Sequence, residues 1–255
     1  MNLHIFESKD AMGRAAAEAG AEAYRRNTQD ANGEGAITVA TGASQFETLD
    51  HLTREELPWP KMTGFHVDEY AGIDITHRAA FCQYLWRRFV SKLPLPMANF
   101  HFMRSLADPQ MECERIGKLL AQNEVAVAFV GIGENAHLGF NDPTADFETK
   151  SSCIVVELDK RCREQQVGEG WFDSFEEVPR TAVTMSVNEM MKSKTIICTV
   201  PDERKAEALR DALEGPVTPK VPASVLQTHP DCHYFVDHAA ASLLTKMEEA
   251  ECLAS

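Results

Sequence analysis

The sequence has 255 residues, of which 44% are hydrophobic, and this length is sufficient for a full hydrophobic core without disulfide or metal staples. A formal net charge of −14 and a pI near 5.1 argue against the clustered Lys and Arg with which proteins bind nucleic acids or anionic membranes. We therefore expect a small-molecule function, with neither a nucleic-acid nor a membrane partner.

The N-terminal residues lack the basic region and long apolar stretch of a secretory signal, so we expect a cytoplasmic protein. The most apolar run, at 125–132, is far shorter than the roughly 20 residues that cross a bilayer. The seven cysteines are odd in number and contain no CxxC pair, which predicts reduced and mostly buried thiols.

Short apolar runs and helical patterns alternate along the chain. The runs predict strands at 3–6, 36–40, 63–67, 125–130, 154–157, 182–187, 195–200 and 233–236. Helices are predicted at 11–26 after Ser8, at 78–90, and after Asp108-Pro109. This alternation predicts a single Rossmann-like α/β domain over 1–255, with a mainly parallel sheet and helices on both faces.

The segment from Val130 to Pro143 carries glycines, an amide, a histidine and a carboxylate directly after an apolar run. A strand that ends in Gly-x-Gly delivers the next side chains to the carboxyl edge of the sheet, where open α/β folds bind ligands. His137 lies five residues before Asp142, so the imidazole can carry a proton while the carboxylate holds the ring. The segment predicts an acid–base site.

A second motif follows the strand predicted at 36–40 and consists of Thr41, Gly42, Ala43 and Ser44. Ser44 and Glu47 have the spacing of a capping box, which would place Ser44 at the N-terminus of the next helix. Free N–H groups and the helix dipole would then form a phosphate cradle. A capped strand-to-helix turn without a ligand would show the same pattern.

Two further motifs end predicted strands. Asp68 and Glu69 are adjacent at a strand terminus, so only one of them can face a given pocket, unless both belong to a solvated acidic strand end. Asp202 is placed as an N-cap, and Arg204 and Lys205 in the following turn oppose the helix dipole unless an anion lies nearby. Exposed charges on an amphipathic helix would also explain these two cations.

All four motifs lie just beyond the carboxyl ends of predicted strands, and in a parallel sheet those ends gather along one edge. A phosphate cradle, a lysine, a carboxylate and a histidine with its own carboxylate could therefore line one pocket. Such a set suits cofactor-free proton transfer on a sugar phosphate.

The order and spacing of segments 41–44, 67–70, 131–143 and 204–206 resemble those of the glucosamine-6-phosphate deaminase family. Relatives of that family include galactosamine-6-phosphate isomerases and 6-phosphogluconolactonases, and the resemblance extends from about residue 36 to residue 237. The ending at 140–143 is similar to the deaminases rather than to the lactonases. The resemblance implies conversion of glucosamine 6-phosphate and water to fructose 6-phosphate and ammonia, with no metal or nucleotide cofactor.

The resemblance also implies a role for each matching residue. His137 matches the acid/base that opens the pyranose ring, with help from Asp142. Asp68 matches the base that takes the C2 proton and returns it at C1. Thr41 to Ser44 and Lys205 match the contacts to the phosphate, which position the reacting end of the substrate.

The sequence departs from the family pattern at several positions. Asn135 and Asp142 stand where many bacterial deaminases carry aspartate and glutamate, and Ala136 replaces a glycine. Segment 165–172 replaces an arginine-bearing segment that contacts the phosphate, and Ile154 stands in a region with no lysine of the allosteric pattern. We therefore expect no allosteric activation, and the second phosphate ligand stays open.

Other functions remain compatible with these residues. The chain could deaminate another amino-sugar phosphate, such as galactosamine 6-phosphate, or hydrolyse a 6-phosphogluconolactone. A non-catalytic sugar-phosphate sensor would keep the fold and the anion site, although the joint presence of Asp68 and His137 argues for an enzyme. The sequence leaves formation of a homo-oligomer open.

Overall fold

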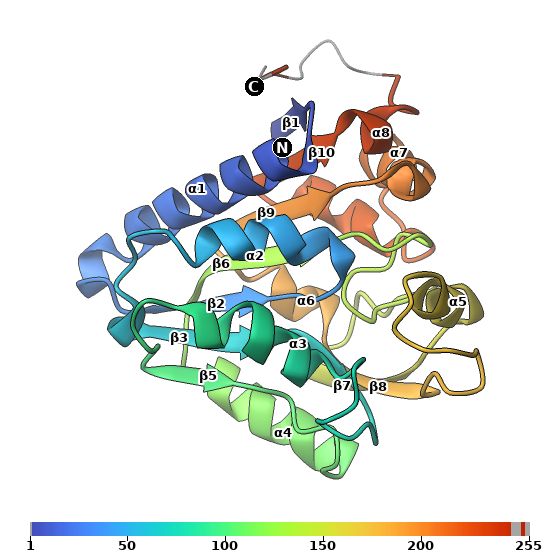
Figure 1. The fold of residues 1–255 in the computed structure, drawn as a ribbon, viewed down its shortest axis with the longest axis horizontal. Coiled ribbons are helices and arrows are strands. Elements are labelled where there is room, and N and C mark those ends of the chain that lie inside the picture. The colour runs from blue at the N-terminus through green and yellow to red at the C-terminus, as the bar shows by residue number, and fades with distance from the viewer. Residues whose placement is uncertain (1, 246–250, 253–255) are drawn as a thin grey trace.

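The computed structural model describes residues 2–245 and 251–252, and its largest element is a twisted sheet of parallel strands (Figure 1). In spatial order the strands are β11 (Glu251–Cys252), β1 (Asn2–Phe6), β10 (Cys232–Asp237), β9 (Thr195–Val200), β6 (Val125–Gly131), β2 (Gly35–Val39), β3 (Met62–His66) and β5 (Asn99–His101). Because every pairing between them is parallel, the strands end along one edge.

Helices cover both faces of this sheet. The α-helices are α1 (Lys9–Asn27), α2 (Phe46–Leu52), α3 (Phe81–Arg88), α4 (Pro109–Leu120), α5 (Lys160–Gly168), α6 (Val187–Met190), α7 (Ala206–Glu214) and α8 (His238–Ala241). Short 3-10 turns are η1 (Gln29–Ala31), η2 (Ala43–Gln45), η3 (Trp59–Lys61), η4 (Val90–Lys92), η5 (Glu203–Lys205) and η6 (Pro222–Thr228). Helices α1, α2 and α3 contribute to the core on one face, and α4, α6, α7 and α8 to the core on the other (Figure 1).

The alternation of side chains along the central strands supplies both cores. In β6, Val127 and Phe129 enter the core shared with α1 and α2, whereas Ala128 and Val130 enter the core shared with α4 and α7. Strands buried on both faces need apolar residues at every position, which is why the central strands read as continuous apolar runs.

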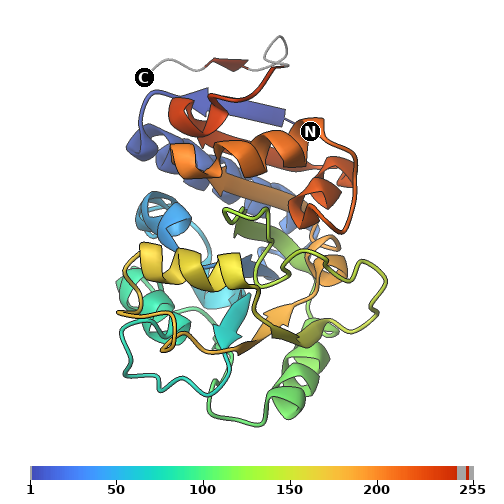
Figure 2. The ribbon, with the colours of Figure 1, turned by 90° about the vertical axis from the view of Figure 1, so that its right-hand side faces the viewer.

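A second, antiparallel sheet lies beside the carboxyl edge of the first. It consists of β4 (Asp68–Tyr70), β8 (Thr181–Met185) and β7 (Cys153–Glu157). Figure 2 looks onto the carboxyl edge of the larger sheet, and α5 lies across the middle of that view. Tyr70, Phe81, Phe140 and Phe172 form an aromatic core between the small sheet and α5.

The predicted α/β class with a mainly parallel sheet is confirmed. The runs at 154–157 and 182–187 form strands as predicted, but they pair antiparallel in the small sheet, and the second run stops at Met185 because Ser186 caps α6. The helix predicted at 78–90 begins only at Phe81. Strands β4 and β5 and helix α5 were not predicted.

The six cysteines whose side chains are described are all free and buried, as predicted: Cys82, Cys113, Cys153, Cys162, Cys198 and Cys232. Cys252 lies outside the residues whose side chains are described. Within the described ranges, no helix is long and apolar enough to cross a membrane.

The close contact of α1 with α2 gives a stability test. A Cβ at Gly13 would lie 2.4 Å from Glu47 Cβ and 2.7 Å from the Glu47 carbonyl carbon, so Gly13→Ala should lower the free energy of unfolding by about 1–3 kcal/mol. Gly117→Ala in α4 is the matched control, because its Cβ would meet only Ser152 Cβ at 3.8 Å and should raise stability by up to about 1 kcal/mol. Urea unfolding measures both, and equal gains would contradict a tight α1–α2 contact.

Candidate active site

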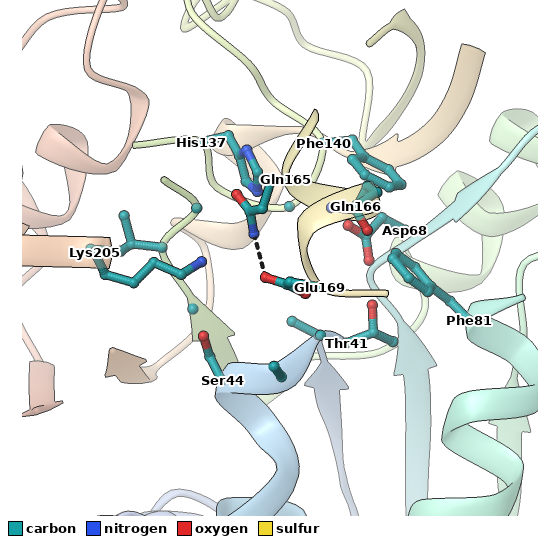
Figure 3. A pocket seen from close by; sticks show the side chains of 17 residues that line it. Thr41, Ser44, Asp68, Phe81, His137, Phe140, Gln165, Gln166, Glu169 and Lys205 are labelled. Atoms are coloured by element: carbon teal, nitrogen blue, oxygen red, sulfur yellow. Dashed lines mark hydrogen bonds between the residues drawn. The ribbon is translucent and has the colours of Figure 1, made fainter. Parts of the chain in front are cut away.

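One pocket at the carboxyl edge of the larger sheet brings together the predicted motifs (Figure 3). The predicted residues that line it are Thr41, Gly42, Ala43, Ser44, Asp68, His137 and Lys205. Asn135 and Asp142 do not line it but form a polar cluster with His137. Parallel strands end on one side of the sheet, and this brings together motifs that are far apart in the sequence. The most distant residues, Thr41 and Lys205, are separated by 164 positions.

The loop after β2 presents backbone donors to the pocket. Gly42 has a φ of 95°, and the turn that follows leaves the N–H groups of Ala43 and Ser44 without an acceptor among the described residues. The loop is held in place by Gln45, whose Nε2 donates to Val130 O at 2.9 Å and to Thr199 Oγ1 at 2.7 Å. Fixed and unsatisfied N–H groups of this kind bind anionic oxygens.

The capping box predicted for Ser44 and Glu47 is wrong. A 3-10 turn, η2, precedes α2, so the N-cap position falls on Gly42 and Ser44 lies within the turn. No side-chain hydrogen bond caps α2. The prediction of a cradle does not depend on that cap, because the free N–H groups of Ala43 and Ser44 precede those that a capping Ser44 side chain would bond.

Asp68 is a buried carboxyl group at the start of β4. Its Oδ1 has no hydrogen-bond partner within the described part of the chain. Burial, followed by the nearby charge of Glu69, raises the pKa of Asp68 to about 8. A carboxylate with a raised pKa is a stronger base than an ordinary aspartate, which suits abstraction of a proton from carbon.

Glu69 faces away from this pocket, as the alternation along a strand predicts. Its carboxylate accepts hydrogen bonds from the N–H groups of Tyr70 at 3.0 Å, Phe81 at 3.1 Å and Cys82 at 2.7 Å. Burial raises the pKa of Glu69 to about 7, although these backbone bonds lower it. Glu69 therefore caps the start of α3, and of the two adjacent carboxyl groups only Asp68 lines the pocket.

His137 is held by Asn135 and Asp142. Its Nδ1 lies 3.3 Å from Asp142 Oδ1, within ion-pair distance although not aligned for a hydrogen bond. Asn135 Nδ2 donates to the same oxygen at 3.0 Å, and Asp159 N donates to Oδ2 at 2.8 Å. Burial alone would raise the pKa of Asp142, but His137, Asn135 and the Asp159 amide lower it overall. Asp142 is therefore an ionised partner for an imidazole that takes up a proton.

The loop that carries His137 folds back on itself. A Cβ at Gly133 would lie 2.2 Å from ring atoms of His137, so the ring can occupy its place only above a glycine. Ala136 has a φ of 65°, in the left-handed region that ordinary residues rarely adopt. An alanine at position 136 therefore adopts the loop conformation at the cost of backbone strain.

Lys205 supplies the cation of the pocket. Only 4% of it is exposed, and it forms no ion pair or hydrogen bond through its ammonium group within the described residues. Burial lowers its pKa, and the negative charges of Glu169 and Glu134 act against that shift. Arg204 points elsewhere and pairs with Glu134 at 3.2 Å, so it needs no bound anion. Only one of the two predicted cations is available to a ligand.

Ten lining residues were not predicted as site residues, and five of them carry aromatic or polar side chains: Phe81, Phe140, Gln165, Gln166 and Glu169. The two aromatic rings stack at 5.6 Å beside Asp68 (Figure 3). The two glutamines and Glu169 come from the end of α5, inside the segment that departs from the family pattern. The expected departure of segment 165–172 from the family pattern was the sequence signal that pointed to this region.

Two clusters bring three candidate metal-ligand atoms within 4.8 Å of one another. They are His66, Glu69 and Cys82, and His137, Asp142 and Cys162. In the first cluster, three backbone N–H groups already occupy the carboxylate. In the second, both carboxylate oxygens accept hydrogen bonds. We assign a metal to neither cluster, since a metal would have to displace these donors.

The raised pKa of Asp68 predicts a stability gain on its removal. In the unfolded chain its pKa is near 3.8, whereas in the folded protein it is about 8, so folding stability falls as the pH rises between these values. Asp68→Asn should therefore raise the free energy of unfolding by about 2–4 kcal/mol at pH 8 and much less near pH 4. Urea unfolding at both pH values measures this. Asp74→Asn, an exposed control, should show no gain, and equal behaviour of the two variants would contradict a desolvated Asp68.

The sequence matches the family described as glucosamine-6-phosphate isomerases/6-phosphogluconolactonase over residues 7–234. A glucosamine-6-phosphate deaminase of Oenococcus oeni is 32% identical over 247 residues, covering 96% of this chain and 100% of that protein. One of Ligilactobacillus salivarius is 34% identical over 207 residues, covering 81% of this chain and 86% of that protein.

Solved structures show the same fold. A monomeric glucosamine-6-phosphate deaminase superimposes with a TM-score of 0.86 at 28% identity, covering 95% of this chain and 100% of that one. A 6-phosphogluconolactonase of Trypanosoma brucei has a TM-score of 0.75 at 14% identity, covering 96% and 98%. The sequence match and the fold together show that this chain belongs to the glucosamine-6-phosphate isomerase/6-phosphogluconolactonase family.

Proposed function

We propose that this protein converts glucosamine 6-phosphate and water to fructose 6-phosphate and ammonia. The observation that carries the proposal is the placement of Asp68, His137 and Lys205 around one pocket with the loop of N–H groups after β2. The similarity to deaminases, at 32–34% identity over most of the chain, supports this substrate over a lactone. The free, buried thiols of the described residues suit a reducing compartment, and we expect the reaction in the cytoplasm.

The substrate phosphate binds at the Lys205 end of the pocket in this proposal. The N–H groups of Ala43 and Ser44 and the Lys205 ammonium group are donors without acceptors among the described residues, so they are free to contact phosphate oxygens. Binding the far end of the sugar fixes the distance to the reacting end and converts a bimolecular encounter into a positioned reaction.

Chemistry then begins with ring opening. The C2 proton becomes acidic only when C1 is a free aldehyde, so His137 first transfers a proton between the C1 hydroxyl and the ring oxygen. Asp142 stabilises the imidazolium that forms in this step. Asp68 next removes the C2 proton to give an enolamine and returns a proton to C1. Water adds to the resulting imine at C2, and ammonia leaves.

A substrate panel tests the assignment. The purified protein is incubated separately with glucosamine 6-phosphate, galactosamine 6-phosphate and 6-phosphogluconolactone, and ammonia, ketose phosphate and lactone are measured. We expect ammonia and fructose 6-phosphate in equal amounts from the first compound. Turnover of the lactone alone would move the protein to the hydrolase branch of the family, and binding without turnover of any compound would make it a sensor.

The role of Asp68 has its own test. Asp68→Asn should abolish exchange of the C2 proton with deuterated solvent and lower kcat by about 100-fold or more, because an amide cannot accept the proton. NMR of substrate and product in D₂O measures the exchange. Asp74→Asn is the surface control and should exchange normally. Exchange that persists in Asp68→Asn would assign the base to another residue.

A further inference from the structure

The end of α5 places a carboxylate in the pocket. Glu169 follows the last helical residue and lines the pocket together with Gln165 and Lys205 (Figure 3). A negative side chain is unexpected beside a subsite that would hold a phosphate, since like charges in a partly dehydrated site repel each other. Its position therefore calls for a function.

Hydrogen bonding fixes the position of the Glu169 side chain. Gln165 Oε1 accepts a bond from Glu134 N at 2.9 Å, so the other end of this amide is the donor, and Nε2 donates to Glu169 Oε1 at 2.8 Å. Trp171 Nε1, which can only donate, lies 3.0 Å from Glu169 Oε2. Both oxygens of Glu169 therefore accept bonds from obligatory donors, which hold the side chain rigidly in place.

Glu169 lines the same pocket as Lys205, so its charge bears on any anion that binds there. Among the neighbouring charges, Glu169 has the largest effect on the pKa of Lys205, opposing the decrease caused by burial. The pKa of Asp68, in contrast, is set by burial and Glu69. The pocket therefore offers a bound anion the Lys205 ammonium group, with the Glu169 carboxylate lining the same space and opposing it.

We propose that Glu169 is a specificity-determining residue that tunes this subsite to a singly charged anion and disfavours a doubly charged one. This assignment rests on the proposed function, because it concerns the charge state of the sugar phosphate bound there. A phosphate monoester has its second pKa near 6, so it is mostly a dianion at neutral pH, and each added charge is repelled by Glu169. A protein of this kind selects the less charged form of its ligand.

Two ligands that differ in charge but hardly in shape test the proposal. Glucose 6-sulfate carries one negative charge, whereas glucose 6-phosphate carries nearly two at pH 8. Their dissociation constants are measured by calorimetry with the full-length protein. The wild type should bind the sulfate at least as tightly as the phosphate, and Glu169→Gln should shift the ratio of the two constants by about 3- to 10-fold in favour of the phosphate.

Matched variants separate charge from packing. Glu169→Ala removes the charge together with both hydrogen bonds and should shift the ratio in the same direction. Glu164→Gln makes the same charge change on α5 at a site that is half exposed and paired with Lys160 at 3.4 Å, and it should leave the ratio unchanged. A ratio that Glu169→Gln does not change would overturn the role of Glu169. Failure of the wild type to bind either ligand would overturn the sugar-phosphate subsite, and the proposed function with it.

Discussion

The desolvation of Asp68 is the constraint on which the rest of the site depends. Between β3 and β4 the chain leaves the parallel sheet for the antiparallel one, and that crossing buries the carboxyl group while pairing β4 with β8. Glu69, the neighbouring carboxyl, is occupied at the start of α3 by three backbone N–H groups. The two sheets and α3 together therefore leave one carboxyl group in the pocket without stabilising donors.

Asp68 and Asp142 have identical side chains, but their surroundings shift the pKa values of the two carboxyl groups in opposite directions. Oδ1 of Asp68 has no partner among the described residues, and burial raises its pKa, whereas hydrogen bonds to Asp142 outweigh burial and lower its pKa. Asp68 thereby binds a proton more tightly than an ordinary aspartate, whereas Asp142, beside His137, ionises more readily. Opposite shifts of this kind are how a single site performs acid and base steps near neutral pH.

Most of the larger sheet could be predicted because its strands are apolar runs, and the meeting of the motifs followed from parallel strand ends. The rest was missed for physical reasons. Strands β4 and β5 have only three residues each, too few to show a period. Helix α5 has few apolar residues, and its buried face includes Gln165 and Gln166, so hydrophobic periodicity could not reveal it. A helix whose buried face is polar lacks the apolar periodicity by which helices are predicted from sequence.

At Ser44 and Ala136, too, the sequence pattern alone could not predict the local backbone conformation. The residue at which the helical turn begins decides whether Ser44 can act as the N-cap. The Ser-x-x-Glu spacing is compatible with either starting residue. At 133 only glycine lets the His137 ring occupy its place, whereas at 136 the positive φ of an alanine costs about 1 kcal/mol of backbone strain. The residue at 136 therefore bears on the energy of the loop, and the residue at 133 on the space available to the His137 ring.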